Sequence, residues 1–363
     1  MFVEVTDTDG NTGLAELAGP AAATDIAQLT AEYAERLRLS PPDGEADVTA
    51  QLGLTVEELE ADRPRATAVS ALRTAIADGQ ARAAGVSLSE FLGGQRTESV
   101  QLYGNMNRSM LPDDNGPRDR SPEAFAAAAR EAVRRGYKVV KCAPFDEARS
   151  PFEEPGLPEA ARSGIDRIVA VREAIGPDIQ LFVDCHSRFD LDSGIALEIS
   201  LRDSNVAWYE EAVDGIEDPE TMIKIRERAT MDVAGAESGY GVELFRRIIE
   251  GGVMDVVMPD IKFCGGAGEA VQIGRALEPD APGSVSMHSP SGPASQLASA
   301  HATAAFKGTR PLEHAWGEAD WRPSGLEPVE RIENGRIYIP EGPGLGASLN
   351  PATVEERGRR WAL

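Results

Sequence analysis

The chain has 363 residues, of which 42% are hydrophobic, and this is enough for one large domain with a smaller one beside it. Its formal net charge is −24, from 60 acidic and 36 basic residues, so we expect it to repel nucleic acid and anionic membranes. No apolar run approaches the ~18 residues of a membrane span, and we expect neither such a span nor a secretion signal.

Three cysteines, Cys142, Cys185 and Cys264, are scattered along the chain. Their odd number and their spacing, which includes no CxxC pair, favour neither a disulfide framework nor a structural zinc site. This usage is typical of a reducing compartment, and we expect a cytoplasmic protein. Because the chain is so acidic, a small anionic substrate would need a local cluster of cations or a bound metal ion.

The two ends of the chain are expected to form the smaller domain together. In residues 1–95, Phe2–Thr6 and Thr12–Glu16 flank an Asp9-Gly10 turn, the pattern of a β-hairpin. Residues 321–363 contain a second predicted hairpin, Ile332–Ile339, and are expected to return to the N-terminal part. Helical patterns at the N-terminal end cover residues 22–38, 55–62 and 66–84.

Residues 96–320 alternate short apolar runs with amphipathic helical stretches such as Glu159–Ile175 and Val242–Glu250. Another helix is predicted after Ser121, where a capping residue precedes a proline and an acid. Eight strand candidates separated by helices predict a parallel β/α barrel. The candidates are Val100–Tyr103, Val139–Ala143, Gln180–Cys185, Val206–Glu210, Asp232–Glu237, Asp255–Asp260, Ser284–His288 and Pro311–Trp316.

An open, doubly wound sheet is the alternative to a barrel. The sequence has no GxGxxG after its first predicted barrel strand and no GxxxxGK[ST] anywhere, which disfavours the nucleotide-binding form of that fold. Gly265-Gly266-Ala267-Gly268 does lie at a strand end. Without the rest of a nucleotide-binding motif, this glycine-rich run is only a weak indication of a phosphate-binding site.

A polar residue closes nearly every predicted barrel strand, at the end where β/α barrels carry their catalytic side chains. From Asp184 onward, successive members of the series are 26, 27, 23, 28 and 25 residues apart, about one β/α unit each. This regular spacing places them on one rim of the barrel. The rim residues are Lys141, Asp184 with His186, Glu210, Glu237, Asp260, His288 and Glu313.

Three of these residues, Asp184, Glu210 and Glu237, end successive strands and are the candidate metal ligands. Hard oxygen ligands without thiolates favour Mg²⁺. The structural alternative is that the same acids pair with lysine or arginine at helix starts, but three acids at apolar strand ends are expensive without compensation. Glu211 competes with Glu210, because adjacent strand residues face opposite ways and only one can point inward.

The strand ends resemble those of the enolase superfamily, specifically the mandelate racemase branch of the mandelate racemase/muconate lactonizing enzyme family. The matching stretches are GYKVVKCA, FVDCHSRF, WYEEA, AGAES, VMPDIKFCGG, SMHSPSG and LEHAW, and VEVTDTDGNTGLAELA and AVSALRTAIADGQARAAGVSLSEFLGG match the capping domain. The resemblance implies an α+β capping domain over a modified TIM barrel, (β/α)₇β. It also implies Mg²⁺ held by one carboxylate from each of three strands, with Glu210 as the ligand of the Glu210-Glu211 pair.

The N-terminal match has one departure from the family pattern. Met1–Thr6 corresponds to what is normally the second strand of the capping domain. The first strand, and the loop that closes over substrate in relatives, therefore have no counterpart in the sequence as given: either its recorded start is too late or the lid is reduced.

The resemblance further implies a dyad in which Asp260 holds one ring nitrogen of His288 and raises the basicity of the other, so that His288 removes a proton. Without such a partner, a histidine on an apolar strand is as often a satisfied core residue. The DCHSR pattern resembles the acid-sugar dehydratases of this branch, such as galactonate dehydratase, in which a histidine at the place of His186 protonates the departing hydroxyl. The alternative is that His186 only supports Asp184.

Racemases of the family often carry Lys-x-Lys on the second strand, whereas this chain has Lys141-Cys142-Ala143. Loss of the second lysine favours elimination by a single base over proton transfer between two bases. Lys141 is then expected to screen the substrate carboxylate, and Glu313, protonated or hydrogen-bonded, to donate to the same oxygens. Lys262 is a weaker candidate base. Other branches of the family have a lysine base at a set distance from a pair of glycines, and in this chain the position at that distance from Gly265-Gly266 is Asp260.

These features together predict a lyase that uses Mg²⁺ to abstract the α-proton of a small hydroxy-carboxylate, dehydrating an acid sugar to a 2-keto-3-deoxy acid. The alternatives are a racemase or epimerase of a hydroxy or amino acid with Lys141 as second base, and a non-catalytic metal-binding relative. The expected partner is a small carboxylate, and family analogy suggests a homodimer or octamer. Candidate pocket residues, for which ordinary loop roles are equally possible, are Asn105, Asn107, Arg108, Arg188 and Tyr240.

Overall fold

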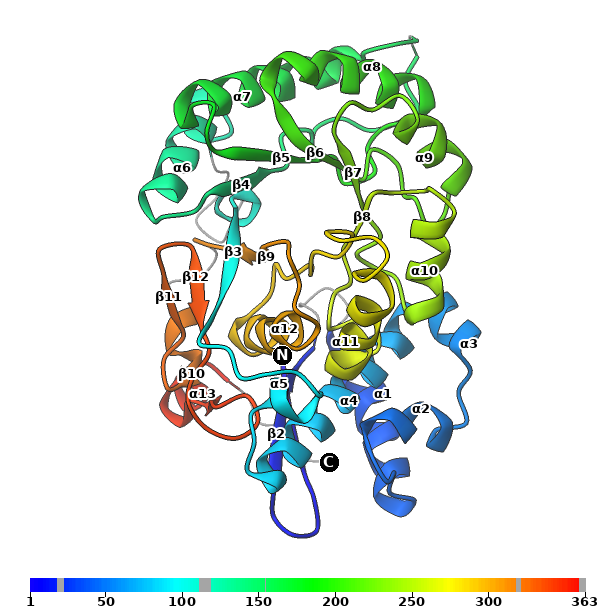
Figure 1. The fold of residues 1–363 in the computed structure, drawn as a ribbon, viewed down its shortest axis with the longest axis vertical. Coiled ribbons are helices and arrows are strands. Elements are labelled where there is room, and N and C mark those ends of the chain that lie inside the picture. The colour runs from blue at the N-terminus through cyan, green and yellow to red at the C-terminus, as the bar shows by residue number, and fades with distance from the viewer. Residues whose placement is uncertain (18–22, 111–118, 154, 318–320, 359–363) are drawn as a thin grey trace.

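The computed structural model describes residues 1–17, 23–110, 119–153, 155–317 and 321–358. A ring of parallel strands forms its centre, with helices around the outside (Figure 1). The strands of the ring are β3 (Ser99–Asn105), β4 (Val139–Cys142), β5 (Gln180–Asp184), β6 (Val206–Glu210), β7 (Asp232–Gly235), β8 (Val256–Val257) and β9 (Leu312–Ala315).

The ring is a closed barrel. Consecutive strands from β3 to β8 pair in parallel, and β9 returns to pair in parallel with β3. Between β8 and β9, bridges from Val285 to Val257 and from His288 to Asp260 fill the remaining place. The predicted barrel is therefore confirmed, but the candidate strand Ser284–His288 is present only as these isolated bridges.

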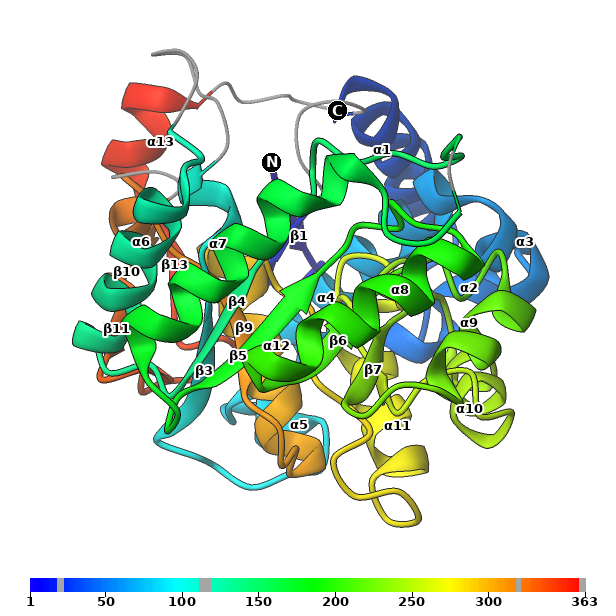
Figure 2. The ribbon, with the colours of Figure 1, turned by 90° about the horizontal axis from the view of Figure 1, so that it is seen from above.

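Within the described residues, seven helices alternate with the barrel strands, which gives the order (β/α)₇β. Figure 2, seen from above, shows α7 and α8 along the outer side of β5 and β6. The first helix begins after Ser121, whose side chain accepts from the backbone N–H of Ala124. The helices are α6 (Pro122–Arg134), α7 (Glu159–Ile175), α8 (Leu191–Leu201), α9 (Pro219–Arg226), α10 (Val242–Glu250), α11 (Gly266–Leu277) and α12 (Pro293–Phe306).

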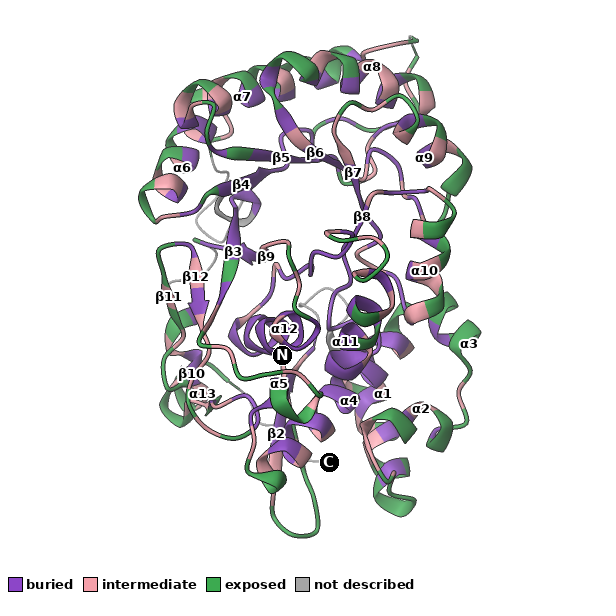
Figure 3. Cartoon of the chain, in the orientation of Figure 1, coloured by how far each residue is buried: buried purple, intermediate pink, exposed green. Residues whose placement is uncertain are grey.

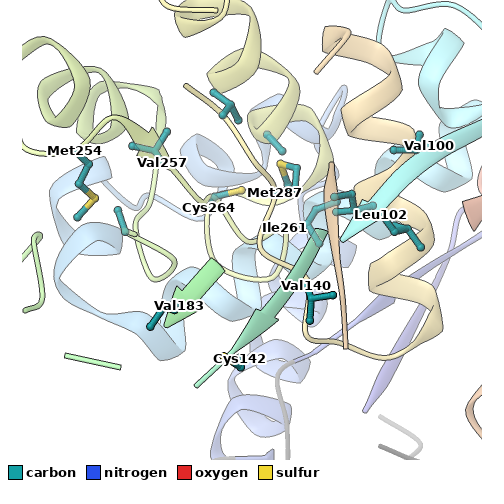
Figure 4. Close-up of a cluster of buried hydrophobic side chains, with 14 of the residues drawn as sticks. Val100, Leu102, Val140, Cys142, Val183, Met254, Val257, Ile261, Cys264 and Met287 are labelled. Carbon is teal, nitrogen blue, oxygen red and sulfur yellow. The ribbon is translucent and has the colours of Figure 1, made fainter. Parts of the chain in front are cut away.

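Alternation along the strands divides the buried side chains into two layers. One layer lies between strands and helices and includes Val140 and Cys142 of β4 (Figure 4). The other fills the barrel interior, where Phe182 and Trp208 stack with ring centroids 3.9 Å apart. Figure 3 shows the strands buried and the outer helix faces exposed. Each fully buried large side chain contributes roughly 1.5–3 kcal/mol, so these layers fix the strand ends in place.

The N-terminal part forms a hairpin and a group of helices beside the barrel (Figure 1). Both hairpin strands match the predicted ranges. The hairpin packs closely on α4, because a side-chain carbon at Gly13 would lie 1.8 Å from the backbone oxygen of Ala75. The elements are β1 (Phe2–Thr6), β2 (Thr12–Glu16), α1 (Ala23–Leu39), α2 (Val48–Gln51), α3 (Val56–Ala61), α4 (Arg63–Ala84) and α5 (Leu88–Phe91).

The C-terminal part contacts both the barrel and the N-terminal helices. The hairpin around Asn334-Gly335 adds β12 to β3 in antiparallel register, whereas Leu345 donates its backbone N–H to Asp78 of α4. Asp78 also accepts from the N–H of Leu14, so one buried carboxylate joins three segments. The proposed boundaries at residues 95 and 321 stay predictions. The elements are β10 (Leu326–Glu327), β11 (Arg331–Glu333), β12 (Arg336–Tyr338), β13 (Ser348–Leu349) and α13 (Pro351–Arg357).

No helix in the described ranges is both long and apolar enough to cross a membrane. The three cysteines, Cys142, Cys185 and Cys264, are buried and free. Single 3₁₀ turns, one of them carrying Asn107 beside the barrel rim, complete the fold. They are Glu45–Asp47, Asn107–Met110, Arg202–Ser204 and Arg322–Gly325.

Candidate active site

Lys141 lies at the centre of the rim and touches carboxylates from three strands. Its Nζ is 2.6 Å from Oε1 of Glu210, 2.9 Å from Oε1 of Glu313 and 3.7 Å from Oδ2 of Asp184. Burial alone would lower the pKa of Lys141, but the three surrounding carboxylates raise it well above the ordinary value. Lys141 is therefore a fixed cation inside an acidic cluster.

Asp184 and Glu210 lie side by side at the ends of β5 and β6, where they pair in register. Both side chains are buried, and because the two carboxylates lie close together their pKa values shift in opposite directions. Burial and the Asp184 carboxylate raise the pKa of Glu210 well above its ordinary value, although Lys141 opposes this. For Asp184, burial raises the pKa, but the charges of His186 and Lys141 outweigh it and lower the pKa. Two close acids that share a cation show this behaviour.

Trp208 also holds Glu210, and sequence reasoning missed it. Its Nε1 donates to Oε2 of Glu210 over 2.9 Å. A signal was available, because residues two apart on a strand face the same way and Trp208 precedes Glu210 by two. Both oxygens of Glu210 thus have a donor.

The backbone around the three candidate ligands adopts a left-handed conformation at non-glycine residues. The φ angles are 48° at His186 and 54° at Ser187, 42° at Glu211, and 67° at Ala236. Each such residue costs roughly 1–3 kcal/mol, a strain that clusters at functional sites. The extended backbone of the strand therefore ends beside each candidate ligand.

This break corrects the expectation that Glu211 points away from Glu210. Strand alternation ends at Glu210, and the positive φ of Glu211 lets its Oε1 accept from the backbone N–H of Ala236 over 3.1 Å. Burial and the nearby Glu237 and Asp184 carboxylates raise the pKa of Glu211 to about 8. Both acids of the pair thus belong to the rim.

His288 lies between two carboxylates on the opposite side of the rim from His186. Its Nδ1 is 2.8 Å from Oδ2 of Asp260, and its Nε2 is 2.7 Å from Oε2 of Glu237. Burial lowers the pKa of His288, but Glu237, Glu313 and the hydrogen bond with Asp260 raise it well above its ordinary value. In turn, burial raises the pKa of Glu237 but His288 lowers it, to about 2. The imidazole therefore faces the acid cluster, in contrast to a histidine satisfied within the apolar core.

His186 contacts the other end of the acid cluster. Its Nε2 is 3.1 Å from Oδ2 of Asp184, and its Nδ1 is 2.8 Å from Oδ1 of Asp146. The charge of Asp184 raises the pKa of His186 to about 11, and the hydrogen bonds that the imidazole donates to Asp146 and Asp184 act in the same direction. Sequence reasoning missed Asp146, which lies on the loop after β4 and carries no motif.

Glu313 accepts hydrogen bonds from its neighbours, and its expected donation to the substrate oxygens stays a prediction. Asn105 Nδ2 lies 2.6 Å from its Oε1, and the backbone N–H of Ser289 lies 3.0 Å from its Oε2. Burial raises the pKa of Glu313, but Lys141 and His288 outweigh it and lower the pKa. Both oxygens of Glu313 therefore have a donor among the neighbouring residues.

Lys262 points at the dyad. Its Nζ is 3.3 Å from Oδ2 of Asp260 and also donates to the hydroxyl of Ser291. The same Asp260 oxygen binds His288, so Lys262 contacts the carboxylate that holds the imidazole. Among the described contacts, Lys262 has none with Asp184 or Glu210.

The remaining candidates are placed differently. Asn107 reaches the rim, with its Nδ2 3.5 Å from Oδ2 of Asp184. Tyr240 packs with apolar residues of the N-terminal helices, and its hydroxyl is 3.4 Å from that of Thr49. Within the described part of the chain, the Nε of Arg188 is buried without a hydrogen-bond partner. The Arg108 side chain lies outside the described residues.

In this arrangement, no three His, Cys, Asp or Glu side chains among the described residues are disposed so that they could hold a metal ion. Each candidate ligand instead contacts a cationic side chain of the same rim: Asp184 contacts His186, Glu210 contacts Lys141, and Glu237 contacts His288. These partners are not the helix-start cations of the structural alternative. The donor set itself, three carboxylates without thiolates at one rim, fits the oxygen preference of Mg²⁺.

The closed parallel barrel with acids and imidazoles at the carboxyl ends of its strands places the chain in the class of β/α-barrel proteins. A family model described as "Enolase C-terminal domain-like" matches residues 124–353, more than half of the chain. The chain belongs to this family, and so to the enolase superfamily that its motifs indicated.

Curated relatives are similar over most of this chain. D-gluconate dehydratase of Thermoproteus tenax is 27% identical over 292 residues, which are 80% of this chain and 56% of that protein. D-xylonate dehydratase of Haloferax volcanii is 27% identical over 80% of this chain and 69% of its own length. D-galactarolactone cycloisomerase of Agrobacterium fabrum is 27% identical over 98% of this chain and 90% of its own length. The chain thus spans little more than half of the first of these relatives.

Solved structures share the fold over nearly the whole chain. A mandelate racemase/muconate lactonizing enzyme-like protein from Rubrobacter xylanophilus has a TM-score of 0.85 and 26% identity, covering 99% of this chain and 94% of that one. A member of the enolase superfamily from Salmonella Typhimurium has a TM-score of 0.84 and 23% identity, covering 98% and 94%. Barrel and N-terminal part are therefore both shared with these proteins.

Proposed function

We propose that the chain is a Mg²⁺-dependent hydro-lyase that removes water from an acid sugar and yields a 2-keto-3-deoxy acid. One observation carries the proposal: an imidazole faces each end of a row of three carboxylates. His186 contacts Asp184 at one end, and His288 contacts Glu237 at the other. Dehydration needs one group that accepts the α-proton and another that protonates the departing hydroxyl, and the row has one at each end.

Asp184, Glu210 and Glu237 are the residues that would hold Mg²⁺. When bound, the ion would act as a Lewis acid for the negative charge that develops on the substrate carboxylate. The cationic side chains that now contact the three acids would then be available to the substrate.

In the proposed reaction, His288 Nε2 takes the α-proton while Asp260 holds its Nδ1. The electrons of the broken C–H bond form the carbon–carbon double bond as the bond from the β-carbon to its hydroxyl breaks. The hydroxyl oxygen leaves with that electron pair, receives a proton from His186 Nε2 and departs as water. The resulting enol tautomerises to the 2-keto acid.

Lys141 would stabilise the charge on the substrate carboxylate, and a preorganised donor of this kind is worth roughly 3–4 kcal/mol in a transition state. The carboxylates around Lys141 raise its pKa well above the ordinary value, which suits a fixed cation for the substrate carboxylate. An epimerase with Lys141 as second base is the alternative function.

A second candidate substrate is a lactone of an acid sugar. The match with the relative named D-galactarolactone cycloisomerase spans 98% of this chain and 90% of that protein. Both shares are larger than those of the two named dehydratases above. Such a substrate would use the same base, His288, for its α-proton.

The test is a screen of the purified protein with Mg²⁺ against acid sugars and their lactones, with detection of 2-keto acids and of α-proton exchange in D₂O. His288→Asn is expected to abolish both turnover and exchange, and His186→Asn to block dehydration while exchange continues. Inversion of stereochemistry without loss of water would support the epimerase. Absence of exchange with every acid, despite bound Mg²⁺, would support a non-catalytic relative.

A further inference from the structure

We propose that Asp146 is a positioning residue for His186, so that the site contains a second carboxylate–imidazole dyad besides Asp260–His288. The role of His186 as the acid rests on the proposed function. The contact itself does not: Oδ1 of Asp146 lies 2.8 Å from Nδ1 of His186. Neither the motifs nor the predicted strand ends include Asp146.

His186 needs such a partner because its side chain is not held by packing. It is 37% exposed and follows β5 on a segment with left-handed backbone at His186 and Ser187. An exposed imidazole keeps several rotamers unless hydrogen bonds select one. Asp146 on one ring nitrogen and Asp184 on the other fix both the ring plane and the direction of Nε2.

Asp146 forms an ion pair with one arginine, and a second arginine holds the backbone of its loop. Arg120 Nη2 lies 3.3 Å from its Oδ2 and donates to the backbone oxygen of Ala143 over 3.0 Å. Arg167 donates to the backbone oxygen of Pro144 over 2.7 Å and to that of Arg120 over 2.6 Å. These bonds hold the turn after β4 in place independently of His186, so the carboxylate is preorganised to receive the imidazole.

The two dyads have the same arrangement at opposite ends of the carboxylate row. In each, an aspartate binds Nδ1 at 2.8 Å and leaves Nε2 facing a candidate ligand, Glu237 for His288 and Asp184 for His186. In Asp260–His288 the aspartate fixes the nitrogen that faces the substrate. By the same geometry, Asp146 directs Nε2 of His186 to where the leaving hydroxyl would lie.

The kinetic test compares Asp146→Ala with Glu147→Ala. Glu147 is the matched control, because it follows Asp146 in the same loop and shares Arg120 with it, but makes no described contact with His186. Asp146→Ala is expected to lower dehydration about 10–100-fold, the range for groups that orient a ligand or catalytic side chain, while α-proton exchange in D₂O continues. Glu147→Ala should leave the ratio of dehydration to exchange unchanged. Asp146→Asn, whose amide oxygen can still accept from Nδ1, should recover part of the dehydration.

A second readout does not depend on activity. The chain has four histidines, so ¹⁵N-histidine labelling gives a resolvable spectrum, with the His186 signals assigned by their loss in His186→Asn. Asp146→Ala should remove the hydrogen-bonded Nδ1–H signal of His186 and keep that of His288, which also reports an intact barrel. An unchanged His186 signal, or an unchanged ratio of dehydration to exchange, would overturn the proposal. If the wild type dehydrates no acid sugar, the proposed function fails, yet the spectrum still decides whether Asp146 holds His186.

Discussion

Lys141 and Glu210 form a buried ion pair at the centre of the rim, with Nζ 2.6 Å from Oε1. Glu210 also accepts from Trp208 through its other oxygen. Because Glu313 and Asp184 lie within 4 Å of the same lysine nitrogen, one cation compensates several carboxylates. The stability of the rim and the charge available to a substrate therefore depend on the same side chain.

Replacing Lys141 is expected to destabilise the protein. Lys141→Met leaves Glu210 and Glu313 buried without their shared cation, and breaking one side of a buried pair costs about 3–5 kcal/mol. Urea unfolding without divalent ions measures the loss. Lys138→Met is the control, because Lys138 is exposed just before β4, and a change there should stay within about 0.5 kcal/mol. Equal free energies of unfolding for the two variants would show that the rim does not depend on the pair.

Mg²⁺ is expected to stabilise the wild type against heat. A ligand at 100 times its Kd adds about 2.7 kcal/mol to the free energy of unfolding, which calorimetry with and without EDTA detects as a shift in Tm. Asp184→Asn and Glu237→Gln should each abolish most of the shift. Glu250→Gln, an exposed acid at the end of α10, should keep it. A full shift in Asp184→Asn would contradict the proposed ligand set.

His301 is expected to make the protein less stable in acid. The buried ring accepts from the N–H of Ser89 at Nδ1 and contacts the oxygen of Leu345 at Nε2, and burial lowers its pKa from 6.5 to about 4. Between these values the unfolded chain binds the additional proton, so stability is full above about pH 6.5 and falls as pH drops towards 4.

The change attributable to His301 is at most about 3 kcal/mol, from the linkage of pKa to free energy. His301→Gln, which keeps an acceptor and a donor, should flatten the pH dependence of urea unfolding between pH 6.5 and 4. His314 contributes in the same direction, because burial lowers its pKa well below the ordinary value, so some dependence remains. An identical profile for wild type and variant would refute the assignment.

Asp78 is expected to control the attachment of both chain ends to α4. It accepts from the N–H of Leu14 and Leu345 and from Arg82, so Asp78→Ala leaves buried donors unpaired at about 1–3 kcal/mol each. Urea unfolding should show the loss, and limited proteolysis should cut the released ends first. Asp178→Ala, in an exposed turn after α7, is the control and should be nearly neutral. Protection of both ends in Asp78→Ala would contradict the assignment.

The sequence by itself determined the barrel and placed one polar residue at the end of nearly every strand. Apolar runs and amphipathic stretches alternate locally, and the acids recur at intervals of 23–28 residues, so each β/α unit delivers one polar side chain to the same edge. The rim positions of Asp184, Glu237 and His288 were predictable for that reason, whereas the choice of Glu210 over Glu211 rested on the family resemblance. Their roles as ligands and base, and the oligomeric state, stay predictions.

Only the tertiary structure decided how these residues face one another. Glu211 joins the rim because its φ of 42° breaks strand alternation, and Glu313 accepts because Lys141 and Asn105 converge on it from other strands. Asp146 reaches His186, 40 residues further along the chain, through a loop that two arginines hold. Periodicity reports which face of an element is buried, whereas loop paths and contacts between distant segments depend on the packed whole.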